Sequence, residues 1–387
     1  MKFKILLLIP LLFLMTGCFN YHELNELAIV TSMGIDLTDD GDYKVSILIA
    51  NGKNSQTNNR EGQSQTVVYS GTGNTISRAF KEINLQIPKI PYIGHLGVVV
   101  VSEDVAKKGM RNILDYLLRN PESVKRFYLI MAKDDSAEDV IQVLSPLETF
   151  PGQSITNNIA ISSEQEAIST TIHYSQFVDD LLRKGKEPTL PTISISGKAD
   201  KGSSNKNLES SNIKTKNKLG PVALFKGDKV VYTTTNSESR GINIITGQID
   251  EMIIETDCDD GNIVVNLTGV SSKINVKKKN NKPLVTIDVS SEGEIQEVTC
   301  QKDIQENKVI LEIESQVEKK LKKKLKKAVE VTQQYKTDIF GIGNLFYKKY
   351  PKDFNKIDNW SDVYTDIDFK YNINVKLNTK GAVEKTI

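Results

Sequence analysis

The chain has 387 residues, of which 39% are hydrophobic and 26% charged, and this composition is ordinary for a globular protein with two or three domains. Its 50 Lys and Arg residues nearly balance its 49 Asp and Glu residues, so it has no overall basic excess of the kind that is usual in nucleic-acid-binding proteins. Three Cys and three His residues leave little material for a structural zinc site.

The first predicted element is a lipoprotein signal peptide over residues 1–17. Lys2 and Lys4 precede an apolar run at residues 5–15, which is too short to span a membrane as a stable helix, and Gly17-Cys18 follows. No other stretch is apolar enough to consider as a membrane segment, so a multi-span protein is excluded. A Cys after a small Gly is typical of bacterial lipoproteins, which carry a diacylglycerol and an N-acyl lipid such as palmitate on that Cys. Several acyl chains would hold the mature protein firmly at a membrane. The alternative is a plain signal peptide with an incidental Cys.

Strands and helices are predicted to alternate from residue 18 to about residue 140. Residues 27–37 and 43–49 alternate in polarity, and Asp40-Gly41 between them indicates a hairpin. Apolar spacing and N-cap residues indicate the elements that follow. Strands are expected at 66–70, 96–101 and 127–132, and helices at 76–83, 103–118 and 136–144. This order is compatible with an α+β or an α/β unit that ends near residues 135–145, and we predict an N-terminal α+β domain over residues 18–140.

The middle of the chain, residues 141–250, is expected to form a second domain. A helix is predicted at 172–182, and strands are predicted at 222–225 and 229–234. Residues 199–219 are rich in Lys, Ser and Asn and have almost no apolar side chains, so we expect an exposed loop or linker there.

The last part, residues 251–387, is expected to form a C-terminal α+β domain. Strand patterns are present at 263–267, 284–289 and 309–313, and an alternating run at 367–375 closes the chain. Val317, Leu321, Leu325 and Ala328 form one apolar stripe of a long helix. The predicted fold class is therefore α+β, with three domains of mixed β-sheets flanked by helices and a long helix packed across the C-terminal sheet.

The sequence contains no recognisable catalytic or metal-binding pattern. His22, His95 and His173 are far apart, none belongs to a His-Glu-x-x-His pattern, and there is no Gly-x-Ser-x-Gly motif. We expect no enzymatic activity, no metal and no cofactor apart from the covalent lipid on Cys18. Once that residue is lipidated, Cys258 and Cys300 remain, and two alternatives are equally open for them: a disulfide, or free buried thiols.

The strongest charge feature is the lysine run of residues 319–327, which contains seven Lys and two Leu residues. One interpretation is a core-facing leucine stripe with a solvated lysine back. The other is a docking surface for an anionic lipid or an acidic partner, because each Lys near an anionic membrane can add about 1 kcal/mol.

Several segments of the chain, taken in order, carry a family resemblance. They are Gly17-Cys18-Phe19 with residues 23–30 and 33–36, Gly94-His95-Leu96 with residues 101–103, Gly109 and residues 113–117, Arg119-Asn120-Pro121-Glu122, residues 225–229 with Glu238-Ser239-Arg240-Gly241, and a C-terminal block with Trp360 and Gly381. This ordered set resembles the Ger(x)C family, the lipoprotein C subunit of nutrient germinant receptors in spore-forming bacteria. That family usually has Asp at the position of Asn120, and residues 145–219 match it least.

The resemblance implies a non-enzymatic α+β protein that is anchored through Cys18 on the outer face of the inner spore membrane. It would act as a scaffold or coupling subunit beside two integral-membrane subunits, the A and B type subunits of the receptor, to trigger germination. Candidate partner contacts are Glu23, Asn25, Glu26, Glu238, Arg240, Lys319, Lys320, Lys323 and Lys327.

Structural alternatives exist for two of these groups. Glu23 to Glu26 would then only start the first domain. Glu238-Ser239-Arg240-Gly241 would form a turn in which Arg240 pairs locally and Gly241 takes a positive φ.

Two other functions compete with the receptor role. A solute-binding lipoprotein of a transporter usually has two similar α/β lobes, and here the C-terminal part is unlike the N-terminal part. A lipid-anchored cell-wall enzyme would need a nucleophile or a metal set, and the sequence shows neither.

Overall fold

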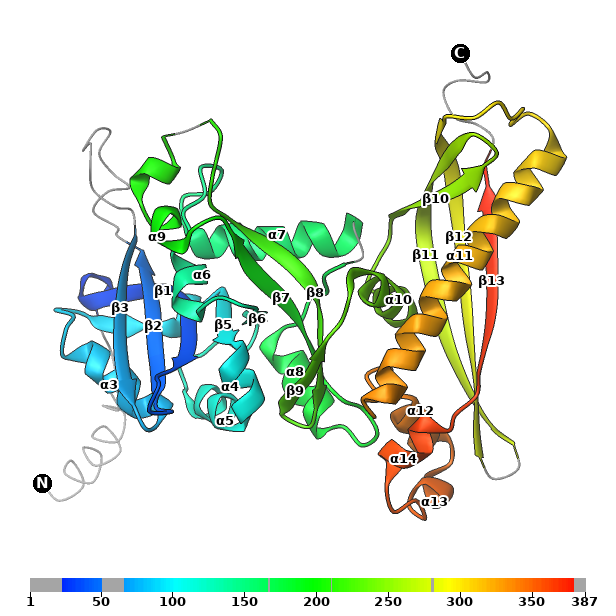
Figure 1. The fold of residues 1–387 in the computed structure, drawn as a ribbon. Helices are drawn as coiled ribbons and strands as arrows, with labels where there is room; N and C mark the ends of the chain where they lie inside the picture. The colour runs from blue at the N-terminus through cyan, green and yellow to red at the C-terminus, as the bar shows by residue number, and fades with distance from the viewer. Residues whose placement is uncertain (1–22, 51–65, 166–167, 210, 280–281, 379–387) are drawn as a thin grey trace, which may run out of the picture.

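Most of the chain after the predicted signal peptide is described by the computed structural model. It describes residues 23–378 apart from 51–65, 166–167, 210 and 280–281, so Cys18 lies outside the described residues. Two sheets, both flanked by helices, make up this part of the chain, which confirms the predicted α+β fold class (Figure 1).

The larger sheet has nine strands and draws them from the first 233 residues. Its order is β3-β2-β1-β5-β6-β7-β8-β9, and β4 pairs with β1 beside this path. The strands are β1 (Leu27–Leu37), β2 (Tyr43–Ala50), β3 (Thr66–Gly73), β4 (Ile90–Tyr92), β5 (Val98–Ser102), β6 (Tyr128–Ala132), β7 (Thr189–Ser196), β8 (Lys216–Lys226) and β9 (Lys229–Thr233). The central strands β1, β5, β6 and β7 are parallel, and antiparallel strands flank them on both sides.

Helices cover both faces of this sheet, as parallel strands require. On one face lie α3 (Ile76–Asn84), α4 (Glu103–Lys108), α5 (Arg111–Arg119) and α8 (Tyr174–Leu182), and on the other lie α6 (Ala137–Gln142) and α7 (Pro151–Gln165). The side chains of β5 alternate between the two cores, with Val99 and Val101 in the first and Val98 and Val100 in the second. All four are fully buried, which explains why β5 is uniformly apolar.

The predicted boundary at residue 140 falls inside this sheet. β6 belongs to the expected N-terminal domain and β7 to the expected middle domain, yet they pair in parallel through Met131↔Thr192 and Ala132↔Ile193. The two sets of strands therefore share one sheet and one pair of cores.

The expected loop or linker at 199–219 contains regular structure, so this expectation needs correction. It holds α9 (Ala199–Gly202), η3 (Asn205–Asn207) and the first residues of β8. Asn207 is buried, and its Nδ2 donates to the backbone oxygens of Thr215 (2.8 Å) and Leu144 (3.2 Å). Polar hydrogen bonds fix this segment, which is why a scan for apolar residues missed it.

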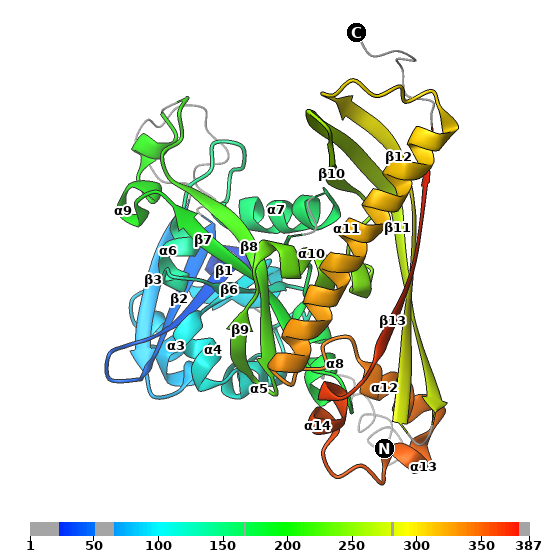
Figure 2. The ribbon, with the colours of Figure 1, turned by 45° about the vertical axis from the view of Figure 1, so that its right-hand side comes forward.

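The smaller sheet has four strands in the order β10-β11-β12-β13, with α11 packed across it (Figure 2). Its elements are β10 (Met252–Cys258), β11 (Gly261–Lys279), β12 (Lys282–Val298), α11 (Asn307–Gln334), α12 (Ile342–Lys349), α13 (Pro351–Phe354), α14 (Trp360–Thr365) and β13 (Phe369–Leu377). The long helix that the leucine stripe predicts is therefore present.

The predicted strand at 309–313 is wrong, because these residues form the first turns of α11. Ile310 and Ile313 are buried and continue the apolar stripe to Val317, whereas Leu311 between them is 64% exposed. That spacing is helical, but four apolar residues within a segment of five do not distinguish a strand from a helix by themselves.

The two sheets meet through α10 (Asn236–Thr246), which follows the last strand of the large sheet and packs against α11. One hydrophobic core includes Val222 and Leu224 of β8, Ile242 and Ile245 of α10, and the inner face of the four-stranded sheet. Side chains of β8 in the large sheet therefore pack in the same hydrophobic core as the four-stranded sheet. Within the described residues, no helix combines the length and the apolarity needed to cross a membrane.

Candidate functional site

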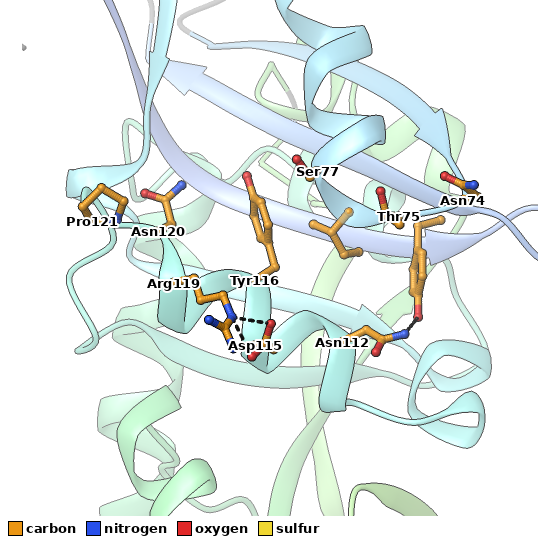
Figure 3. Close-up of a pocket in the computed structure, with 11 residues that line it drawn as sticks. Asn74, Thr75, Ser77, Asn112, Asp115, Tyr116, Arg119, Asn120 and Pro121 are labelled. Carbon is orange, nitrogen blue, oxygen red and sulfur yellow. Dashed lines mark hydrogen bonds and ion pairs between the residues drawn. The ribbon is translucent and has the colours of Figure 1, made fainter.

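A pocket of about 470 Å³ lies between the N-terminal end of α3 and one side of α5 (Figure 3). Thr75 caps α3, because its Oγ1 accepts the backbone N–H of Arg78 at 3.2 Å, and this places Asn74 and Ser77 at the rim. Figure 3 shows Tyr116 pointing from α5 toward α3.

One face of α5 packs in the core, and the other face lines this pocket. Ile113, Leu114 and Leu117 are buried in the core of the large sheet. The other face presents Asn112, Asp115, Tyr116 and Arg119, at spacings of three and four residues, to the pocket.

The charges in the pocket neutralise each other. Nε of Arg119 donates to both carboxylate oxygens of Asp115, at 2.8 and 3.0 Å, and this hydrogen bond lowers the pKa of Asp115 and raises that of Arg119. Burial raises the pKa of Tyr116, so its phenol stays protonated at neutral pH. The lining contains amides, hydroxyls and phenols besides the Asp115–Arg119 pair, and such groups can form hydrogen bonds with a small polar molecule.

This pocket was not predicted from the sequence, and none of the candidate contact residues lines it. The Arg119-Asn120-Pro121 motif contributes to its wall, but the contribution of residues 74–77 was missed. A hydrophilic face on α5 was the available signal, and nothing in the sequence indicated which element lies opposite.

Glu23, Asn25 and Glu26 lie at the start of the described chain. Glu23 is the N-cap of a short 3₁₀ helix, η1 (Leu24–Glu26), which contains the other two residues. The backbone N–H of Glu23 donates to Oε2 of Glu26 at 3.2 Å, and Nδ2 of Asn25 donates to Oε2 of Glu23 at 3.2 Å. All three line an open groove with residues 84 and 87–91. The three predicted partner contacts that are nearest to Cys18 in the sequence therefore line the same groove.

Glu238 and Arg240 lie in α10, so the predicted turn with a positive φ at Gly241 is wrong. Glu238 and Thr235 form a reciprocal capping box at the start of the helix, through bonds of 2.7 and 3.4 Å. Gly241 is helical, and a Cβ there would lie 2.3 Å from the carbonyl oxygen of Lys324. Glycine is needed because α10 and α11 approach each other closely at this point.

The lysine run lies in the middle of α11. Leu321 and Leu325 are buried in the core, as the core-facing interpretation predicts. Lys319, Lys323 and Lys327 are exposed.

Two lysines of the run are engaged with their surroundings. Nζ of Lys320 donates to the carbonyl oxygen of Glu255 (2.9 Å) and to Oδ2 of Asp257 (3.1 Å). Burial, followed by the nearby charge of Arg240, lowers the pKa of Lys324. The docking role of the run stays a prediction.

Cys258 and Cys300 form a disulfide bond, with their Cα atoms 6.4 Å apart. It ties the end of β10 to the segment that follows β12. Among the described residues, no group of three or more His, Cys, Asp or Glu side chains could hold a metal ion.

Comparisons with known proteins match both halves of the chain. Residues 20–195 match the family model described as the spore germination protein N-terminal domain, and residues 221–381 match the one described as spore germination B3/GerAC like, C-terminal.

Two relatives are from Bacillus subtilis (strain 168). Spore germination protein KC is 27% identical over 357 residues, which covers 90% of this chain and 88% of the relative. Spore germination protein B3 is 24% identical and covers 97% of each chain.

A solved structure shares the fold. The crystal structure of the GerBC protein has a TM-score of 0.53 to this chain at 19% identity, over 89% of this chain and 96% of that one.

Proposed function

The chain belongs to the Ger(x)C family of spore germination proteins, and on that premise we propose that it is the lipoprotein C subunit of a nutrient germinant receptor. The observation that carries the proposal is the match of both family domains, in order, over nearly the whole chain. The protein would act as a scaffold or coupling component beside two integral-membrane subunits.

The proposal includes an anchor at Cys18 on the outer face of the inner spore membrane. Support comes from the sequence, in which a short apolar segment ends at Gly17-Cys18. The first described element, η1, begins at Leu24, only six residues after Cys18.

Two of the family-like motifs hold helices in place in the fold. In Met33-Gly34-Ile35-Asp36, the carboxylate of Asp36 caps α6 by accepting the backbone N–H groups of Ala137 (2.7 Å) and Glu138 (3.0 Å). Gly34 lets α6 approach, because a Cβ there would lie 2.9 Å from the backbone of Ala137.

The motif Phe225-Lys226-Gly227-Asp228-Lys229 acts in the same way. The backbone oxygen of Asp228 accepts the N–H of Met110 at 2.8 Å, and its Oδ2 accepts the N–H of Arg111 at 3.1 Å. This fixes the start of α5 against the β8–β9 hairpin. Both motifs hold helices on the large sheet, so both have a structural role within this chain.

One observation favours a second candidate, a solute-binding lipoprotein: the α3–α5 pocket has the volume and the polarity for a small solute. Against it, the pocket lies between two helices on one face of the large sheet rather than between two similar lobes. The two sheets also differ in strand number and order. Saturable binding of an amino acid or sugar to the mature protein would favour this candidate.

The receptor role is tested with spores that lack the gene. We expect nutrient-triggered dipicolinate release to be lost, while release by a non-nutrient trigger stays normal. Complementation with the intact gene should restore the response. An unchanged response to every nutrient, in spores with no related C subunit, would contradict the proposal.

The anchor is tested by Cys18→Ala, with Cys300→Ala as the matched control. We expect the first variant to stay an unlipidated, uncleaved precursor by mass spectrometry, and the second to be processed normally because Cys300 lies in the folded C-terminal part. Normal acylation of the Cys18→Ala protein would contradict the lipoprotein assignment.

A further inference from the structure

Large apolar side chains are exposed at the end of the molecule where the described chain begins. Leu24 is 77% exposed, Leu85 is 83% exposed and Ile90 is 39% exposed. Exposed leucines are common when they occur singly, but a group of them at one end indicates an interaction surface.

Ile90 lines one groove, and Leu24 and Leu85 are chain neighbours of residues that line it. Leu24 lies in η1 between Glu23 and Asn25, and Leu85 directly follows α3. Ile90 lies in β4, where it pairs with Leu27 at the start of β1. Two segments line the groove between them: residues 23, 25 and 26 from the first, and residues 84 and 87–91 from the second.

The length of the preceding chain limits how far this surface can be from a lipid on Cys18. Residues 19–23 separate Cys18 from Leu24. Even fully extended, this segment reaches only about 20 Å at roughly 3.3–3.6 Å per residue. It also contains Phe19 and Tyr21, and aromatic residues, Tyr in particular, are common at the interface between membrane and water.

We propose that Leu24, Leu85 and Ile90 form a membrane-docking patch that inserts into the interfacial region of the bilayer carrying the Cys18 lipid. This inference rests on the proposed lipidation of Cys18. Side chains of this kind enter a bilayer to a depth of roughly 5–10 Å, which the short tether allows.

Local charge favours apolar insertion over electrostatic attraction. The groove carries two carboxylates, Glu23 and Glu26, and one ammonium group, Lys89. This balance gives no attraction to anionic lipids, so docking should be insensitive to salt. The patch would fix the orientation of the large sheet on the membrane, which a flexible lipid tether alone does not do.

The test uses the lipidated mature protein in vesicles of neutral lipid, some with brominated acyl chains that quench tryptophan on contact. The chain contains a single native tryptophan, Trp360, whose emission in the wild-type protein provides the baseline. We add one tryptophan as Leu85→Trp, and as the matched control Leu147→Trp, at a residue that is 88% exposed between α6 and α7. Both sites are on the surface, so both variants should fold.

We expect the added emission of Leu85→Trp to shift to shorter wavelength and to be quenched by the brominated lipid, equally at low and high salt. The emission of Leu147→Trp and the Trp360 baseline should not change. Leu24→Trp should repeat the result of Leu85→Trp.

Two results would overturn the inference and are distinguishable from each other. If the protein is lipidated and bound to vesicles but Leu85→Trp and Leu24→Trp are not quenched, the patch does not insert and the receptor role is untouched. If both become shielded from an aqueous quencher only when the two membrane subunits are co-reconstituted, the patch binds a partner subunit instead. A protein that carries no lipid by mass spectrometry would contradict the proposed anchor itself.

Discussion

Asp338 is a carboxylate buried at the start of α12, with 2% of its surface exposed. Its Oδ1 accepts the backbone N–H of Ile342 at 3.0 Å, and its Oδ2 accepts the N–H of Gly343 at 2.7 Å and Nε1 of Trp360 at 2.8 Å. Burial outweighs these donors and raises the pKa of Asp338 to about 6. A single side chain thus joins α12 to α14 and makes their packing sensitive to pH.

The raised pKa predicts that this part of the fold loses stability as pH rises. Between pH 3.8, the ordinary pKa, and about 6, the native state holds a proton that the unfolded state has lost. The contribution of Asp338 is therefore fully present below pH 3.8 and is lost as pH rises through 6. The free energy of unfolding of the wild type minus that of Asp338→Asn should fall by about 2 kcal/mol between pH 4 and pH 7.

Urea unfolding followed by Trp360 emission measures this difference, because Trp360 is the sole tryptophan and contacts Asp338. Asp362→Asn is the matched control, since Lys336 lowers the pKa of the exposed Asp362 and its effect should have the opposite sign. An equal wild-type-minus-variant difference at the two pH values would contradict the assignment for Asp338.

At the scale of whole elements, the periodicity of apolar residues correctly predicted the strands and helices that have one face in a core. Residues 27–37 and 43–49 form β1 and β2 with the expected hairpin between them. Alternate side chains of each strand point into a core, which gives the sequence its period of two. Residues 172–182 contain α8, and the leucine stripe forms the inner face of α11.

Elements fixed by long-range contacts were not predictable in the same way. α10 carries the buried polar residues Ser239 and Asn243, whose partners lie far away in the chain. Oγ of Ser239 accepts the N–H of Val222 at 2.8 Å, and Nδ2 of Asn243 donates to the carbonyl oxygen of Ser169 at 2.7 Å. The α3–α5 pocket was not predicted for the same reason, since its walls come from separate parts of the chain.

The close crossing of α10 and α11 yields a prediction for Gly241→Ala. In an exposed helix this change would stabilise by about 1 kcal/mol. Here the new Cβ would meet the carbonyl oxygen of Lys324 at 2.3 Å and Cβ of Ala328 at 2.8 Å, so the helices must separate. We expect the free energy of unfolding to fall by about 1–3 kcal/mol.

Chemical denaturation of the mature protein measures the effect, and Asn236→Ala on the exposed start of α10 is the control, which should change stability far less. Limited proteolysis should cut the Gly241→Ala protein faster between β9 and β10, where the two sheets are joined. A Gly241→Ala protein as stable as the wild type would show that the crossing can relax.

At the scale of the molecule, the proposed membrane patch and the lysine run lie on different sheets. Leu24 and Leu85 border the large sheet, whereas α11 packs on the four-stranded sheet, and Figures 1 and 2 both show α11 on the side away from α3. The disulfide and the α10–α11 contact hold the C-terminal part together and join it to the large sheet. A protein built in this way can present one surface to the bilayer and another to a protein partner.

Neutralising the exposed lysines tests whether the second surface binds a partner subunit. The variant carries Gln at Lys319, Lys323, Lys326 and Lys327, all of which are exposed, and keeps Lys320 and Lys324, which are engaged with the fold. Gln preserves helix propensity, so the thermal transition should not change. Recovery of the two membrane subunits from spore membranes should fall roughly tenfold. This corresponds to a loss of about 1.4 kcal/mol of binding free energy, shared among four exposed charges.

The control carries Gln at four exposed lysines on other elements, Lys348, Lys352, Lys356 and Lys370, and should recover both subunits normally. Because the membrane patch lies on the large sheet, the α11 variant should still bind vesicles as the wild type does. Loss of vesicle binding with normal subunit recovery would assign the lysine run to the lipid surface. A lower thermal unfolding temperature of the variant would instead show that the lysine run stabilises α11. Only selective loss of the subunits fits a molecule in which the bilayer is contacted at one end and the receptor partner at the other.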